Sequence, residues 1–286
     1  MAAPRANVLN RRPGLRVGLL LLPPMLWLGV AYLVALGALF VTSLWGQNAF
    51  TGTIERVWTL DNFRDLFTIE VYRTITLRTL GIAALVTIVD AVLAFPIALY
   101  MAKVASPRLQ RLMVIAVLMP LWASYLVKVY AWRAMLQPES GVLAWFLDPI
   151  GLNSPGYGYL GIVITLTYLW LPYMILPIYA GLTRLPDSML DASADLGAKS
   201  GRTFRSVVMP IIFPSIVAGS VFTFSLSLGD YITAQIVGGK VTMLGNVVQT
   251  TYVTNLPFAA AVATIPVVIV LLYLLAVRRS GALNSL

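Results

Sequence analysis

The 286-residue sequence contains no cysteine and no histidine, and only 11% of its residues are charged. The first two absences exclude a disulfide framework and a zinc site built from cysteine and histidine. They also exclude a Ser-His-Asp or Cys-His catalytic triad and a haem ligated by histidine. Soluble domains are about a quarter charged, so this chain has too little charge to cover a globule of its size.

Long apolar runs take the place of that missing charge, and hydrophobic residues make up 59% of the chain. A membrane-spanning helix needs roughly 20 mostly apolar residues. The runs are continuous, unlike the short alternating segments of a membrane β-barrel. They predict an all-α membrane protein, and the first run is too long for a cleaved signal peptide. The six predicted spans are 15–43, 75–102, 112–132, 159–182, 214–237 and 258–277.

Lysine and arginine are distributed unevenly between the two sides that six spans define. With the N-terminus placed inside, thirteen of the 20 basic residues fall in inner segments and seven in outer ones. Cytoplasmic loops carry the excess of Lys and Arg, so the tails 1–14 and 278–286 are both predicted to be cytoplasmic. The net charge of +9 is then an orientation signal for the membrane domain 15–277. It does not indicate nucleic-acid binding, because no basic stripe lies on a soluble domain.

The predicted outer loops are small, and none could form a catalytic domain. In the first, residues 57–67 are typical of a short amphipathic helix for which Asp61 is a candidate N-cap. The second, residues 133–158, is rich in proline and glycine and therefore in turns. Aromatic side chains near this edge are predicted to form an interfacial belt. They are Tyr125, Tyr130, Trp132 and Trp145.

The inner loop 185–210 is long for a helical connection. Its helix-starting and helix-ending residues predict two short helices. Pro186 suits a first helical turn, Gly197 a left-handed helix end, and Ser200 the cap of a second helix. Met189, Ala192 and Leu196 would then share one helix face. Two interpretations fit this pattern. The loop is either a rigid elbow on which these three side chains form an apolar knob, or an ordinary solvated helical hairpin.

This loop resembles the EAA loop of permease subunits of ABC importers. The family pattern is an acidic residue, two small residues, three further residues and a glycine. The matching residues here are Asp191-Ala192-Ser193 and Gly197, followed by Val207-Val208-Met209-Pro210. The sequence departs from the pattern in having Asp191 for the usual Glu and Ser193 for the second Ala. Both changes keep the small-residue geometry.

The resemblance extends over nearly the whole chain. Segments 59–63, 94–98 and 171–173 take part in it, as does Gly229-Asp230-Tyr231 with Gly238-Gly239. Residues 94–98 and the glycine-flanked set look most like the first permease of spermidine/putrescine importers. Permeases for ferric ion, aminoethylphosphonate or thiamine share much of the pattern and remain alternatives.

The resemblance implies a mechanism of alternating access in a bacterial inner membrane. The elbow would dock on a cytoplasmic ATPase dimer, a second homologous permease would pair with this chain, and a periplasmic or lipid-anchored protein would deliver the solute. The pairing could be a heterodimer or a homodimer. The residues implied in ATPase docking are Asp191, Ala192, Ser193, Leu196, Gly197, Ala198, Thr203 and Phe204.

ATP and Mg²⁺ would bind to the partner ATPase, and this chain is predicted to hold no cofactor of its own. Its only Gly-Lys pair is Gly239-Lys240. Ala234 and Val241 stand where a phosphate-binding loop needs Gly and Ser/Thr. A membrane-embedded enzyme would need clustered catalytic groups that the spans lack. An ATP-independent secondary transporter or channel would not explain the EAA-like elbow.

Two acidic residues, Asp90 and Asp230, fall inside predicted spans. A charged group there costs roughly 2.5–3.5 kcal/mol on insertion scales, so each should face a cavity or a partner. Two interpretations of Asp90 stay open: it forms a structural hydrogen bond to a neighbouring helix, or it lies in the solute pathway. Asp230 lies among poor helix formers, which favours the pathway. Trp170, Tyr173 and Tyr231 could add cation–π contacts to a dication, or they could simply pack between helices.

Overall fold

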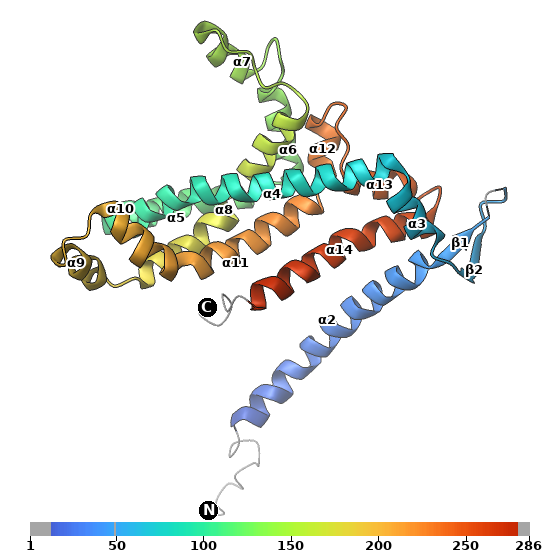
Figure 1. The fold of residues 1–286 in the computed structure, drawn as a ribbon, viewed down its shortest axis with the longest axis horizontal. Coiled ribbons are helices and arrows are strands. Elements are labelled where there is room, and N and C mark those ends of the chain that lie inside the picture. The colour runs from blue at the N-terminus through green and yellow to red at the C-terminus, as the bar shows by residue number, and fades with distance from the viewer. Residues whose placement is uncertain (1–12, 49, 280–286) are drawn as a thin grey trace, which may run out of the picture.

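The computed structural model describes residues 13–48 and 50–279, and this part of the chain is mostly helical (Figure 1). Five helical stretches are long and apolar enough to cross a membrane, and a bent helix pair could provide a sixth crossing. The long helices are α2 (Pro13–Ser43), α4 (Glu70–Leu99), α5 (Pro107–Trp122), α8 (Tyr159–Arg184), α11 (Met209–Leu228) and α14 (Leu256–Arg279). These stretches coincide with the predicted apolar runs, which confirms the all-α membrane fold.

Short elements connect the long helices. They are β1 (Trp45–Gln47), β2 (Ile54–Trp58), α3 (Asp61–Thr68), η1 (Tyr100–Val104), α6 (Tyr125–Met135), α7 (Val142–Leu147), η2 (Asp148–Ile150), α9 (Asp187–Asp195), α10 (Ser200–Thr203), η3 (Phe204–Val208), α12 (Ile232–Val237) and α13 (Leu244–Thr251). Figure 1 places α9 and α10 at one end of the bundle and α3 with the β1–β2 hairpin at the other. This separation agrees with the sides assigned to the two loops that contain them.

The core is a three-helix packing of α4, α8 and α11. Small residues allow these helices to approach closely, as is common between membrane helices. A Cβ on Gly219 would lie 3.2 Å from the Met174 Cα atom, and one on Gly181 would collide with Ser215. One apolar cluster gathers around Val86 and a second around Ala94, about two turns farther along α4.

Helix α2 lies outside this core and contacts mainly α14. Most of its described side chains are exposed, and Trp27 keeps 76% of its surface open. An apolar helix with so little protein around it needs lipid or another membrane subunit to cover its side chains.

The third predicted span, 112–132, is not one continuous helix. It consists of α5 and α6, which meet at an angle of 95°. Pro120 lies in the last turn of α5, and Ala123 and Ser124 both have extended ψ angles, of 142° and 137°. Pro120 is a possible signal for this bend, but the continuous apolar run around it predicted a single span because proline is tolerated in membrane helices.

The fifth predicted span, 214–237, differs from the structure at both ends. Helix α10 continues through η3 into α11, so the helical stretch begins at Ser200 instead of Pro214. Pro210 is the second residue of α11 and directly follows η3, so the helical stretch runs through this proline. The stretch ends at Leu228, and residues 229–231 separate it from α12.

The first predicted outer loop also contains a β-hairpin that the sequence did not reveal, with β1 paired antiparallel to β2. The amphipathic helix is present as α3, but Asp61 is its first residue and Leu60 holds the N-cap position. Asp61 instead accepts a hydrogen bond of 2.6 Å from Thr59 Oγ1. Asn62 fixes α3 to the end of α2 and the start of β1 by donating to the carbonyl oxygens of Ser43 and Trp45.

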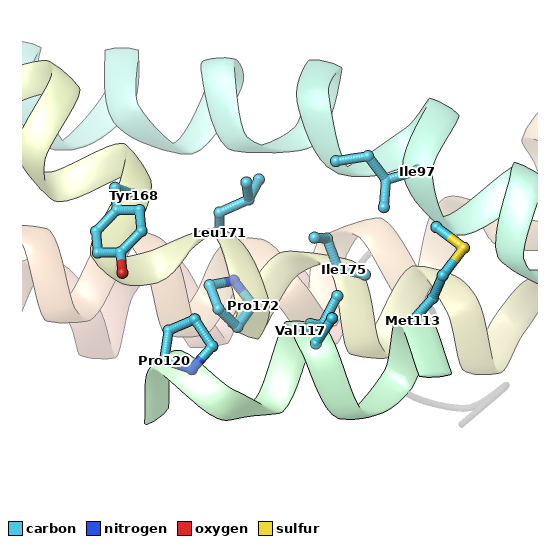
Figure 2. A pocket seen from close by; sticks show the side chains of 9 residues that line it. Ile97, Met113, Val117, Pro120, Tyr168, Leu171, Pro172 and Ile175 are labelled. Carbon is cyan, nitrogen blue, oxygen red and sulfur yellow. The ribbon is translucent and has the colours of Figure 1, made fainter. Parts of the chain in front are cut away.

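A cavity of about 270 Å³ separates α5 from the core (Figure 2). Pro120 of α5 and Pro172 of α8 both line it, and Ile97 closes it from α4. The labelled side chains are apolar apart from the Tyr168 hydroxyl, so the cavity offers no group to bind a charged solute. Helix α5 has no fully buried side chain, and half-buried Met113, Val114 and Val117 pack against the core beside the cavity.

Candidate solute cavity and coupling elbow

Asp230 lies in the break between α11 and α12, where its carboxylate completes the start of the second helix. Its Oδ1 atom accepts a 2.8 Å hydrogen bond from the backbone N–H of Thr233. Its Oδ2 atom accepts from the Thr233 hydroxyl at 3.1 Å and also from the Tyr125 hydroxyl. A side-chain oxygen that takes up a free N–H of the first turn is what a helix start requires.

The same residue lines a cavity of about 220 Å³, together with Tyr125, Trp170, Gly229 and Tyr231. Asp230 is 7% exposed. Three of the predicted pathway residues, Asp230, Tyr231 and Trp170, are therefore brought together. A carboxylate surrounded by aromatic faces can hold an organic cation through Coulomb attraction and cation–π contacts.

The aromatic rings form a continuous series that leads away from this cavity. Trp170 stacks on Tyr125 with ring centroids 6.0 Å apart, and it meets the edge of Tyr173 at 5.9 Å. Tyr173 in turn stacks against Phe222. Tyr173 thus adjoins the cavity through Trp170 but does not line it.

Tyr125 is the residue of this cavity that the sequence interpretation missed. It was expected in the interfacial belt, but it is half-buried and bound to Asp230. Its oxygen also lies 2.8 Å from Thr233 Oγ1. The bend between α5 and α6 turns Tyr125, the first residue of α6, toward the α11–α12 break. The sequence interpretation did not include the bend, so it could not place Tyr125 beside Asp230.

Asp90 does not line the Asp230 cavity. It is fully buried on α4, between the turn of Val86 and that of Ala94, and neither carboxylate oxygen has a hydrogen-bond partner among the described residues. The hydrogen bond to a neighbouring helix that one interpretation expected is therefore not formed there. Trp170 Nε1 and Ser227 Oγ are also buried without a partner in the described part of the chain.

The loop 185–210 forms a compact elbow. Helix α9 ends next to Gly197, which has a left-handed φ of 73°, as predicted for a glycine helix end. Its start differs from prediction, because Pro186 is the N-cap of α9 and not a first-turn residue. Ser200 is the first residue of α10, and Lys199 takes the cap position expected for Ser200.

The residues predicted to dock an ATPase fall into two groups. Asp191, Ala192, Leu196 and Gly197 are exposed, and Leu196 keeps 88% of its surface open. Met189 is also exposed, so the apolar knob on α9 faces outward. The others hold the elbow together.

That second group comprises Ser193, Ala198, Thr203 and Phe204. The Ser193 and Thr203 hydroxyls lie 2.8 Å apart and join α9 to α10. Ala198 is half-buried. Phe204 meets Phe95 of α4 edge-on at 5.1 Å, so it connects the elbow with the helix core.

Residues 83–280 match the family described as the binding-protein-dependent transport system inner membrane component. The chain belongs to this family. A relative from Escherichia coli strain K12, the inner membrane ABC transporter permease protein YdcU, is 44% identical over 96% of this chain and 92% of its own length. The spermidine/putrescine transport system permease protein PotB of Haemophilus influenzae is 30% identical over 92% of this chain and 90% of that protein.

Solved structures show the same fold at low identity. A chain of a bacterial alginate ABC transporter superposes with a TM-score of 0.69 at 15% identity, covering 98% of this chain and 99% of that one. A chain of the MetNI methionine ABC transporter gives 0.57 at 17% identity, over 76% of this chain and 99% of its own. The permease is thus a multi-pass inner-membrane subunit of an ABC importer, and it is a transport protein rather than an enzyme.

Proposed function

We propose that this permease carries a small organic cation, of the spermidine/putrescine class, through the membrane by alternating access. The observation that supports this most is the buried Asp230 carboxylate in a cavity lined by Tyr125, Trp170 and Tyr231. A carboxylate repels an anionic group, which disfavours a phosphonate solute. The PotB relatives are named for spermidine and putrescine. Ferric ion and thiamine are the competing cations.

The driving force would come from a separate cytoplasmic ATPase dimer, which would bind ATP and Mg²⁺. The exposed residues of α9, with Leu196 as the apolar knob, suit docking in a cleft of that ATPase. The Ser193–Thr203 contact would keep the elbow rigid while the ATPase moves it. An ATP-independent transporter would have no use for such a knob.

Two further partners complete the proposal. A second homologous permease would pair with this chain, as a heterodimer or as a homodimer, and the exposed apolar surface of α2 is one place where it or lipid could pack. A binding protein on the outer side would deliver the solute. Asp90 remains a proposed pathway residue, because a buried carboxylate without a partner suits a group that a passing cation engages.

Asp230→Asn separates the charge of Asp230 from its hydrogen bond to the first turn of α12. The asparagine side-chain oxygen can still accept from the Thr233 N–H, so α12 should keep its start while the negative charge is lost. Uptake of labelled spermidine and putrescine should fall about a hundredfold, since one buried charged contact contributes about 1.5–3 kcal/mol. Assembly with the ATPase should be unchanged.

The matched control is Asp65→Asn, which removes an exposed carboxylate from α3 and should leave uptake unchanged. Labelled ferric ion and thiamine are measured in parallel. Unchanged spermidine uptake in Asp230→Asn would refute the pathway role of Asp230. Uptake of ferric ion or thiamine in place of polyamine by the parent protein would refute the substrate class.

A further inference from the structure

Lys103 connects the end of the second span to the start of the elbow. It lies in η1, the π-helical continuation of α4, and its side chain is 14% exposed. Its Nζ atom donates to the carbonyl oxygen of Leu185 and to Asp187 Oδ1, both at 2.6 Å. Leu185 is the residue after α8, and Asp187 is the first residue of α9. One ammonium group therefore holds the hinge between the fourth span and the elbow.

Helix α9 is held at its other end as well. Ser193 contacts Thr203 of α10, and α10 continues without interruption into α11. The elbow is thus attached to α4 through Lys103 and to α11 through Thr203. A push on α9 would reach two of the three core helices at once.

Both attachments lie at π-helical segments. Lys103 is part of η1, and Thr203 immediately precedes η3. Phe95 and Phe204, whose rings meet at 5.1 Å, join the same two helices beside them. Such π segments occur often at functional sites and interrupt the regular helix register. They mark the two points at which the elbow is joined to α4 and α11.

We propose that Lys103 is a positioning residue that transmits the movement of α9 to α4 and so couples ATP hydrolysis to the opening of the solute cavity. This rests on the proposed docking of an ATPase on α9. Lys103 does not line the solute cavity, and its contact with α9 is at Asp187, at the opposite end of that helix from Leu196 and Gly197. Its loss should therefore leave docking intact and let the ATPase turn over without moving the core helices.

Three variants test the two bonds separately. Lys103→Met removes both, Asp187→Asn removes the ion pair and keeps the bond to Leu185, and the exchange Lys103→Glu with Asp187→Lys restores the ion pair alone. The full complex with its ATPase is reconstituted in liposomes, and spermidine uptake and ATP hydrolysis are measured together. The number of spermidine molecules taken up per ATP hydrolysed should fall about tenfold in Lys103→Met, because this variant loses two hydrogen bonds of a charged group.

Asp187→Asn should show a smaller loss, and the exchange variant should recover part of the coupling. Arg108→Met, which removes an exposed basic residue of α5 outside the elbow, is the matched control and should behave like the parent. An unchanged ratio in Lys103→Met would overturn the proposal. Loss of ATPase co-purification with the parent protein would instead contradict the proposed docking.

A second measurement does not depend on the solute. The chain has no cysteine, so Val104→Cys and Asp195→Cys, both at exposed positions, can carry two spin labels without background from this chain. In the parent complex the label distance should form one narrow distribution that ATP does not change. With Lys103→Met added, it should broaden or shift with ATP. A distribution identical to that of the parent would overturn the role of Lys103.

Discussion

Asp230 is already occupied before any solute arrives, because the Tyr125 hydroxyl donates to it. Under the proposed function, an incoming cation would have to compete with that hydroxyl for the carboxylate. Tyr125→Phe removes the competitor and leaves the ring stacked on Trp170. If Asp230 binds the solute as proposed, the KM for spermidine uptake should fall about tenfold.

Tyr130→Phe is the control for this substitution, because Tyr130 lies on the same helix but is 56% exposed. Its KM should match that of the parent. A KM that rises in Tyr125→Phe would show that the hydroxyl binds the solute directly. An unchanged KM would show that it does not compete at all.

The residues of the solute cavity differ in how well the sequence could predict them. Asp230 was found because an acid in an apolar run is costly and needs a reason. Tyr125 was not, because the bond between Tyr125 and Asp230 joins positions 105 residues apart. Aromatic residues at the end of an apolar run are typical of an interfacial belt, and only the tertiary structure distinguishes the two roles.

At the scale of elements, the turn after α9 depends on Gly197. Its φ of 73° is unfavourable for most side chains, although a Cβ there would meet no neighbouring atom within 4 Å. Asparagine tolerates this conformation, whereas a β-branched residue does not. Gly197→Val should therefore abolish co-purification of the ATPase, and Gly197→Asn should retain it. Equal binding by both variants would contradict a role for the turn in docking.

The elements themselves were predictable where one physical rule dominates. Runs of apolar residues predicted the long helices, and Leu185 before Pro186 ends α8 because the residue before proline avoids the helical conformation. The 95° bend after Trp122 and the continuous helix from Ser200 into α11 were missed. Both depend on how neighbouring helices pack, and local propensity leaves that undetermined.

At the scale of the whole molecule, the excess of Lys and Arg predicts which end of the bundle faces the cytoplasm. The elbow and the hairpin lie at opposite ends (Figure 1). Single cysteines in this cysteine-free chain can test the assignment in intact cells with a membrane-impermeant maleimide. Ser140→Cys should be labelled from outside, and Ser188→Cys only after the cells are permeabilised. The reverse pattern would invert the orientation.

We expect this chain to keep solute binding and ATPase docking in separate places. The most direct test measures ATP hydrolysis and spermidine uptake together, in liposomes prepared with the ATPase, the other transporter subunits and either the parent protein, Asp230→Asn or Gly197→Val. The parent should do both, Asp230→Asn should hydrolyse ATP without uptake, and Gly197→Val should do neither. If Asp230→Asn transports spermidine at the parent rate, or Gly197→Val retains coupled uptake, the account is wrong.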